Sequence, residues 1–201
     1  MPTLPRNSLT ALTLSCFLSA PFASAQSEGG GSAYEYRLLA TTKTSTMEKE
    51  LNQSGGEGFR YRHVMGGETG FGGSEVVVVM TRDPAATVEP RYQYKLLATS
   101  KTSTMEKELQ EAGDAGFECV GQTIFSSTFG GEEVTIIMER DRDKALTSYE
   151  YRLVATTKTS TFQKELNLEG QEGFAVVGLT VAETAFGGTE LVAVMRRERV
   201  P

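Results

Sequence analysis

The sequence predicts an α+β protein made of three tandem β-α-β-β repeats, each with one helix and a three-stranded sheet in the order 1-3-2. The first observation is an internal repetition, because closely similar segments begin at Tyr34, Tyr92 and Tyr149, which are 58 and 57 residues apart. A period of that size indicates duplicated supersecondary units. The second observation is the hydrophobic pattern within each copy, which is typical first of a strand, then of a helix, then of two more strands.

The expected boundaries follow from the repetition and from the composition between the copies. We expect a signal peptide at 1–25, a flexible leader at 26–33, repeat 1 at 34–83, a connector at 84–91, repeat 2 at 92–141, a connector at 142–148, repeat 3 at 149–198 and a tail at 199–201. Connectors this short suit repeats that pack on one another. We therefore expect the three sheets to pack about a pseudo-threefold axis, with the helices outside.

The first 25 residues have the pattern of a secretory signal peptide. Arg6 precedes an apolar stretch at 9–22 that is too short and interrupted to span a membrane, and an Ala-Ser-Ala sequence ends at Ala25. We therefore expect export from a bacterial cell, to the periplasm or the exterior, after cleavage near Ala25. The alternative is lipidation of Cys16. It would require leucine at the position of Thr13, so we favour simple cleavage.

Each copy begins with a half-buried strand, because apolar residues alternate with others, as they do from Tyr34 to Ala40. We expect the helix that follows to begin at a capping box, in which a serine and the residue three positions later satisfy backbone N–H groups. The boxes pair Ser45 with Glu48, Ser103 with Glu106, and Ser160 with Gln163. The buried stripe of each helix ends in a glycine that permits close packing on the sheet. The stripes are Met47, Leu51 and Gly55; Met105, Leu109 and Gly113; and Phe162, Leu166 and Gly170.

A second glycine should lie just past each helix in the left-handed conformation, followed by a phenylalanine that contacts the helix. These pairs are Gly58 with Phe59, Gly116 with Phe117, and Gly173 with Phe174. Two strands follow, joined by a Phe-Gly-Gly-x-Glu sequence that favours a hairpin. A strand follows these glycines, whereas a phosphate-binding loop would need a helix there. The last strand is apolar on both faces, which places it in the middle of its sheet.

Repeat 1 differs from the others in its second strand, where it has Arg60, Arg62 and His63. One interpretation is an anion-recognising patch. The other is a solvated strand that tolerates charge, and we favour it because strict alternation would put His63 on the face opposite the two arginines.

Cys119 is the only cysteine that remains after signal cleavage, so no disulfide framework is expected. We favour a small buried apolar residue, since Tyr61 and Val176 occupy the equivalent positions. The alternative is an intermolecular disulfide or a reactive thiol.

The composition argues against most enzyme classes. The chain has one histidine, and its histidines, cysteines and carboxylates lack the spacing typical of metal sites or activated nucleophiles. Its net charge of −6 argues against nucleic acid and anionic membrane surfaces as partners. We expect no enzyme activity, no cofactor, no metal and no membrane span.

Three motifs, each present three times, resemble a bacterial family of small β-α-β-β domains, the domain of unknown function numbered four-one-seven-seven. They are Tyr-x-Tyr-[Lys/Arg]-Leu-[Leu/Val], Gly-x-x-Gly-Phe at the helix end, and Met-x-Arg at the end of the last strand. Family members have Gly-x-Glu-Gly-Trp-Glu at the helix end, to which 113–118 is the nearest match, with Phe117 in place of Trp. Arg60 and Ala175 stand where the final Glu is expected. The resemblance implies the fold and supplies no catalytic residues.

These observations predict a non-enzymatic exported protein that acts as an interaction or scaffold module. It would bind a protein partner or assemble with its own copies through exposed sheet edges. The alternative is a small-ligand-binding protein with a pocket between the repeats.

Overall fold

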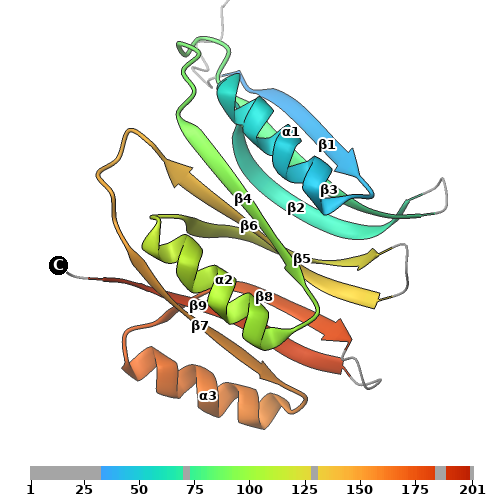
Figure 1. Ribbon diagram of the computed structural model, residues 1–201, viewed down its shortest axis with the longest axis vertical. Coiled ribbons are helices and arrows are strands. Elements are labelled where there is room, and N and C mark those ends of the chain that lie inside the picture. The colour runs from blue at the N-terminus through green and yellow to red at the C-terminus, as the bar shows by residue number, and fades with distance from the viewer. Residues whose placement is uncertain (1–32, 70–72, 128–130, 184–188, 200–201) are drawn as a thin grey trace, which may run out of the picture. The chain divides into compact units, whose positions relative to one another are not determined.

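The computed structural model describes residues 33–69, 73–127, 131–183 and 189–199, all within the unit Ser32–Pro201 (Figure 1). The elements are β1 (Glu35–Thr41), α1 (Thr44–Gly56), β2 (Arg60–Thr69), β3 (Gly73–Arg82), β4 (Tyr92–Thr99), α2 (Thr102–Asp114), β5 (Glu118–Ser127), β6 (Gly131–Asp141), β7 (Tyr149–Thr156), α3 (Thr159–Gln171), β8 (Ala175–Glu183) and β9 (Thr189–Glu198). The expected signal peptide and Cys16 lie outside the described residues, as do nearly all of the leader and parts of the Phe-Gly-Gly turns. The expectations for them stay predictions.

Each repeat forms the sheet that the sequence predicts, with the third strand in the middle. The orders are β1-β3-β2, β4-β6-β5 and β7-β9-β8, and both outer strands run antiparallel to the central one. The central strand is buried on both faces, since the consecutive residues Ile136 and Ile137 of β6 are both fully buried. Residues that follow one another in a strand point to opposite faces. The α+β fold class and the strand order are therefore confirmed.

The helices begin one residue before the serines of the expected capping boxes. Lys43 is the N-cap of α1 and makes no side-chain capping bond, and the same holds for Lys101 and Lys158. The hydroxyl that acts here belongs to the end of the preceding strand, because Lys43 N–H donates to Thr41 Oγ1 at 3.1 Å. The capping-box prediction is wrong, and Glu48 instead accepts a hydrogen bond from Leu96 N–H of the next repeat.

The helix ends are as the sequence predicts. Gly58, Gly116 and Gly173 have φ values of 84°, 80° and 87°, the left-handed conformation that glycine adopts without strain. Phe59 N–H donates to Ser54 O at 3.0 Å, the long bond of a Schellman cap. The side chain of Phe59 is fully buried.

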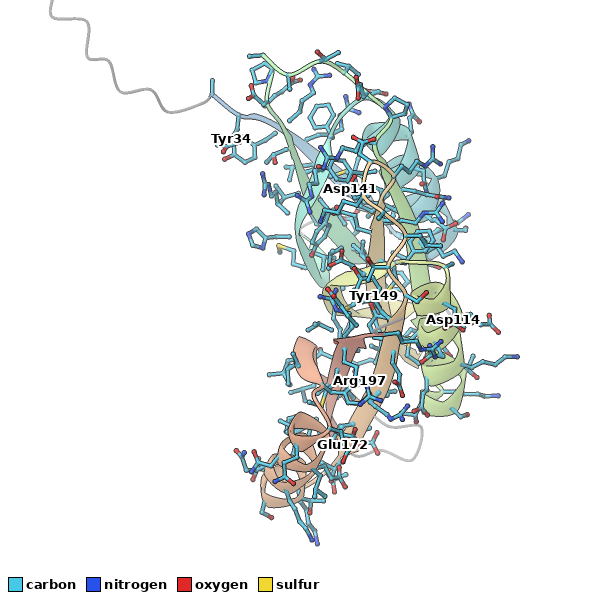
Figure 2. All side chains as sticks on the ribbon, turned by 90° about the vertical axis from the view of Figure 1, so that its left-hand side faces the viewer. Tyr34, Asp114, Asp141, Tyr149, Glu172 and Arg197 are labelled. Atoms are coloured by element: carbon cyan, nitrogen blue, oxygen red, sulfur yellow. The ribbon has the colours of Figure 1, made fainter. Side chains whose placement is uncertain are left out.

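An arginine from the last strand of each repeat holds the end of the helix. Arg197 Nη1 donates to Glu172 O at 2.6 Å, and its guanidinium carbon lies 4.5 Å from the centroid of the Phe174 ring. Figure 2 shows Glu172 and Arg197 close together beside α3. Arg82 and Arg140 make the same two contacts in the other repeats. A cation suits the negative end of the helix dipole, so the Met-x-Arg and Gly-x-x-Gly-Phe motifs form one structural unit.

The second strand of each repeat carries a β-bulge. In β2, Tyr61 pairs with Met80 and His63 pairs with Val79, so Arg62 is an extra residue between them. β5 and β8 have the same irregularity at the equivalent place. A bulge reverses the alternation of side chains beyond it, because one strand advances by a residue without its partner.

The repeats pack in series. α1 contacts β4 and α2 contacts β7, while β2 contacts β5 and β5 contacts β8 (Figure 1). Within the described residues, no element of repeat 1 is in extensive contact with an element of repeat 3. This differs from the expected arrangement about a pseudo-threefold axis, in which equivalent faces would meet. The helix-bearing face of one repeat instead packs on the opposite face of the next sheet, because the helix leaves part of its own face uncovered.

The hydrophobic cores cross the boundaries between repeats. The first core joins Met47 and Leu51 of α1 with Tyr94, Phe125 and Ile137 of repeat 2. The second joins α2 with the first and last strands of repeat 3. The third core is smaller and contains residues of repeat 3 only. Repeats 1 and 2 therefore complete their cores with residues from the following repeat.

The connector after repeat 1 is held by a paired arginine. Arg91 binds Asp141 with two bonds, from Nε to Oδ1 at 2.7 Å and from Nη2 to Oδ2 at 2.6 Å. The Arg91 guanidinium holds the pKa of Asp141 below its usual value by hydrogen bonding to the carboxylate. The pair joins the start of β4 to the end of β6.

Replacement of Arg91 should make the free energy of unfolding change less steeply with pH in the acidic range. Because the folded pKa of Asp141 is lowered, the pair stabilises the fold above the ordinary Asp pKa of about 3.9. That contribution is lost as the pH falls through the lower folded value. Arg91→Gln should lower the free energy of unfolding by about 1 kcal/mol at pH 7 and make its decline in acid shallower. Urea unfolding across that pH range measures both, with Arg142→Gln as the charge-matched control. Parallel curves for Arg91→Gln and wild type would contradict the prediction.

Candidate functional site

Consecutive repeats are joined by a tyrosine that lies against a helix glycine. The ring of Tyr94 packs on α1 at Gly55, where an added Cβ would come within 2.7 Å of the Tyr92 carbonyl oxygen and 3.0 Å of Tyr94 Cε2. The Tyr94 hydroxyl accepts a hydrogen bond from Tyr61 N–H at 2.9 Å and donates one to Glu139 Oε2 at 3.0 Å. Burial raises the pKa of Tyr94, and the nearby Glu139 charge adds to this, so the hydroxyl remains a donor.

A side chain of the helix also binds the edge of the next sheet. Asn52 Nδ2 donates to Tyr94 O at 2.9 Å, and Tyr94 N–H donates to Asn52 Oδ1 at 3.0 Å. Leu96 N–H donates to Glu48 Oε2 at 2.9 Å. α1 thereby satisfies three backbone groups in the middle of the outer edge of β4, which disfavours this edge as a template for another strand.

The contact between repeats 2 and 3 has the same parts. Tyr151 packs on α2 at Gly113, where an added Cβ would lie 2.9 Å from Tyr151 Cδ2. Its hydroxyl accepts a hydrogen bond from Cys119 N–H at 2.8 Å. Gln110 takes the place of Asn52, since Nε2 donates to Tyr149 O and Oε1 accepts from Tyr151 N–H, both at 3.2 Å. One mode of packing therefore occurs twice in the chain.

Each of the two contacts contains an ion pair, and the basic and acidic residues occupy opposite sides of the contact in the two cases. Between repeats 1 and 2, Arg60 at the start of β2 binds Glu139 of β6, with Nη2 and Oε1 2.9 Å apart. Between repeats 2 and 3, the equivalent positions hold Glu118 and Arg196, with Oε2 and Nη1 also 2.9 Å apart. The charges have changed places between the two partners.

The second strands approach one another at glycines. A Cβ on Gly66 of β2 would overlap the carbonyl oxygen of Ile124 in β5, and one on Gly121 of β5 would overlap the hydroxyl of Tyr61. A side chain cannot be added at either position without displacement of the neighbouring strand or ring.

Repeat 1 presents a sheet surface on which no other described repeat packs, and we call it the head face. It is the side of the sheet away from α1 and includes Tyr36, Leu38, His63, Met65 and Val79. Tyr36 is 67% exposed, whereas its equivalents Tyr94 and Tyr151 are each 1% exposed. The head face therefore has a tyrosine equivalent to those of the internal contacts, but no described part of the chain packs on it.

Repeat 3 presents the other half of the same contact, which we call the tail face. It is the helix-bearing side of the last sheet and includes Asn167, Gly170, Val176, Leu179 and Val181. Val176 is 48% exposed, while its equivalents Tyr61 and Cys119 are 8% and 5% exposed. No described atom lies within 4 Å of a Cβ added at Gly170. The tail face therefore has open space at Gly170 for a tyrosine ring like those that cover Gly55 and Gly113.

His63 pairs with Val79 and belongs to the head face, and Arg62 is the extra residue of the bulge. Arg60 instead reaches Glu139 and the Tyr92 ring of repeat 2, so the structure does not bring Arg60 and His63 together. Both arginines are engaged by groups of this chain, since Arg60 binds Glu139 and Arg62 Nε donates to Thr81 Oγ1 at 2.7 Å. An anion-recognising role for the three residues stays a prediction.

Cys119 lies in the core that joins repeats 2 and 3 and is 5% exposed. Burial raises its pKa to about 12, so the thiol is protonated at neutral pH and is a poor nucleophile. This position favours a packing role. An intermolecular disulfide stays a prediction that would require β5 to separate from repeat 3.

Two pockets lie beside the connectors where the sequence allows a ligand site between repeats, one of about 290 Å³ at the first connector and one of about 420 Å³ at the second. Four arginines line the pocket at the first connector, at positions 60, 62, 82 and 91. Arg82 is paired with Glu35 at 2.6 Å and Arg91 with Asp141, so their charges are already compensated. The pocket therefore offers an anionic ligand less than its arginine content suggests.

Comparisons with models of known families, with curated proteins and with solved structures gave no match to this chain. The resemblance to the bacterial domain family stays a prediction. Among the described residues, no helix combines the length and apolar character needed to cross a membrane.

Sequence reasoning did not find the head and tail faces, although a signal for them existed. Equivalent positions of the three repeats carry different charges in a complementary order. In the second strand they are Arg60, Glu118 and Ala175, and in the last strand they are Thr81, Glu139 and Arg196. The neutral members belong to the uncovered faces of the first and last repeats.

Neighbouring glycines of α1 should respond in opposite ways to alanine. Gly55→Ala should lower the free energy of unfolding by about 1–3 kcal/mol, because the added Cβ meets the Tyr92 carbonyl. Gly56→Ala should raise it by up to about 1 kcal/mol, because nothing lies within 4 Å and alanine favours the helix. Urea unfolding of both variants checks the prediction. Equal effects would show that the helix does not approach β4 at Gly55.

Removal of the buried tyrosine hydroxyl should weaken the contact between repeats. Tyr94→Phe should lower the free energy of unfolding by about 1–3 kcal/mol, because Tyr61 N–H and Glu139 lose a buried partner. Tyr36→Phe removes the same atom from an exposed ring and should change stability by less than about 0.5 kcal/mol. Both are compared with wild type by urea unfolding at low protein concentration, and indistinguishable values for Tyr94→Phe and Tyr36→Phe would refute the assignment.

Proposed function

We propose that this chain is an exported, non-enzymatic scaffold protein that assembles with its own copies through its two end surfaces. The observation that carries the proposal is the exposure of the head and tail faces. Tyr36 and Leu38 are each 67% exposed on the head face, and Leu179 and Val181 are 61% and 52% exposed on the tail face. Apolar side chains gathered on a surface of this kind are typical of protein–protein interaction sites.

The faces support assembly better than the sheet edges expected from the sequence. The outer edges of β4 and β7 are occupied by hydrogen bonds from Asn52 and Gln110 of the preceding helices. Of the large apolar side chains that are exposed among the described residues, eight belong to the end repeats and two, Val88 and Leu146, belong to the connectors.

A structural role is also favoured by where the perturbed titratable groups lie. The tyrosines at 61, 94, 149 and 151 and the thiol at 119 all have raised pKa values, and burial is the largest cause in each case. These groups belong to the contacts between repeats, where the hydroxyls of Tyr94 and Tyr151 both accept and donate hydrogen bonds within the chain. Export is supported by the signal pattern that ends near Ala25.

The mass of the chain beginning at Gln26 should increase with protein concentration. Light scattering across a wide concentration range measures this, with and without reductant. We expect the same growth in both conditions, because Cys119 is buried with its thiol protonated. A mass fixed at one chain at every concentration would overturn assembly. A mass that fell on reduction would instead indicate a disulfide through Cys119.

A further inference from the structure

The two internal contacts between repeats provide a pattern for a contact between molecules. Each uses a helix-bearing surface from one repeat and the opposite sheet surface from the next, and the described residues leave one uncovered surface of each kind. We propose that copies of this chain add head to tail, with the head face of one copy packed on the tail face of the next. This inference rests on the proposed function and specifies the surfaces that join the copies.

The tyrosine and the glycine of the internal contacts have uncovered equivalents on the end surfaces. Tyr36 corresponds to Tyr94 and Tyr151, and Gly170 corresponds to Gly55 and Gly113. Tyr36 is 67% exposed, and Gly170 has open space where the other two glycines have a strand against them. In the proposed contact, the Tyr36 ring of one copy lies on α3 of its neighbour at Gly170.

The polar groups needed for the contact are also present. Tyr36 pairs with Thr81 in the same register as Tyr94 with Glu139, so its backbone N–H and C=O face the outer edge of β1. Asn167 of α3 is exposed and corresponds to Asn52, whose amide binds both backbone groups of Tyr94. Asn167 would bind the edge of β1 in the next copy in the same way.

The charges at the junction are compatible with addition of a copy. The internal contacts pair Arg60 with Glu139 and Glu118 with Arg196. The corresponding pair between copies is Ala175 with Thr81, which is uncharged. This pair itself adds no ion to the junction, and burial of an unpaired ion is the usual obstacle to such a contact. The charge beside it is Arg62, whose Nε donates to Thr81 Oγ1 at 2.7 Å.

The contact joins two different surfaces, so it is heterologous. Repeats 1 and 3 show no extensive contact within the described residues, so the packing continues in series inside one chain. Addition of a copy by the same packing leaves a free head face at one end and a free tail face at the other. We therefore expect open chains of copies rather than a closed dimer.

The test uses one variant for each surface. Gly170→Ala places a Cβ on the tail face, where the equivalent atom on Gly113 would lie 2.5 Å from a strand carbonyl oxygen. Tyr36→Ser removes the ring from the head face. Each variant should lower the apparent association constant at least about tenfold. Gly56→Ala makes the same change as Gly170→Ala at an open helix position away from both faces and should assemble as wild type does.

Mixing the two variants makes the test decisive. Gly170→Ala keeps an intact head face and Tyr36→Ser keeps an intact tail face, so an equimolar mixture should form pairs of one chain each and grow no further. Sedimentation velocity of the mature chains measures this, and urea unfolding at low concentration confirms that each variant is folded. Leu38→Asp is a second head-face variant and should behave as Tyr36→Ser does.

The outcomes separate the two proposals. If both variants assemble as wild type does, the copies join elsewhere and the head-to-tail contact is refuted, while assembly stands. If each variant alone is blocked but the mixture forms no pairs, the two faces do not bind each other. A wild-type mass fixed at one chain would overturn both the contact and the proposed function.

Discussion

The packing of a tyrosine ring on a helix glycine is the contact on which the rest of the structure depends. At Gly55 and Gly113 the absence of a side chain lets the helix approach the next repeat, and the tyrosine hydroxyl then satisfies a backbone N–H of the second strand. The helix amide can bind the strand edge only at this distance. A larger side chain at either glycine would separate the two repeats and expose the core between them, because that core contains residues from both sides.

This dependence explains why the unit of folding is larger than one repeat. A segment of about fifty residues buries too little apolar surface to be securely stable by itself. In repeats 1 and 2 the following sheet completes the core, as Tyr94 and Ile137 do for α1. Repeat 3 has no such cover, and its core is the smallest of the three. Stability in such an array depends on neighbouring repeats, so the end repeats should open first.

The features that could be predicted from the sequence are those decided within a few residues. Left-handed glycines, buried phenylalanines and the doubly apolar central strand all leave a local pattern. The capping boxes failed because Glu48 binds Leu96, a residue that only the folded chain brings near. The bulge at Arg62 could not be predicted because it has no local signature. The order of the repeats in space depends on pairs such as Arg60 with Glu139, which become meaningful only when the copies are compared with one another.

The exchanged ion pairs have a consequence for how the chain reaches its native state. A repeat can pack on a repeat that is not its native neighbour, and tandem repeat proteins are prone to such misassembly. Here, docking of repeat 1 on repeat 3 would set Arg60 against Arg196, and docking of repeat 2 on repeat 2 of another molecule would set Glu118 against Glu139. Both errors bring like charges together at a partly buried position, while the native order brings opposite charges together. The opposite arrangement of charges in the two ion pairs therefore favours the native order of the three similar repeats during folding.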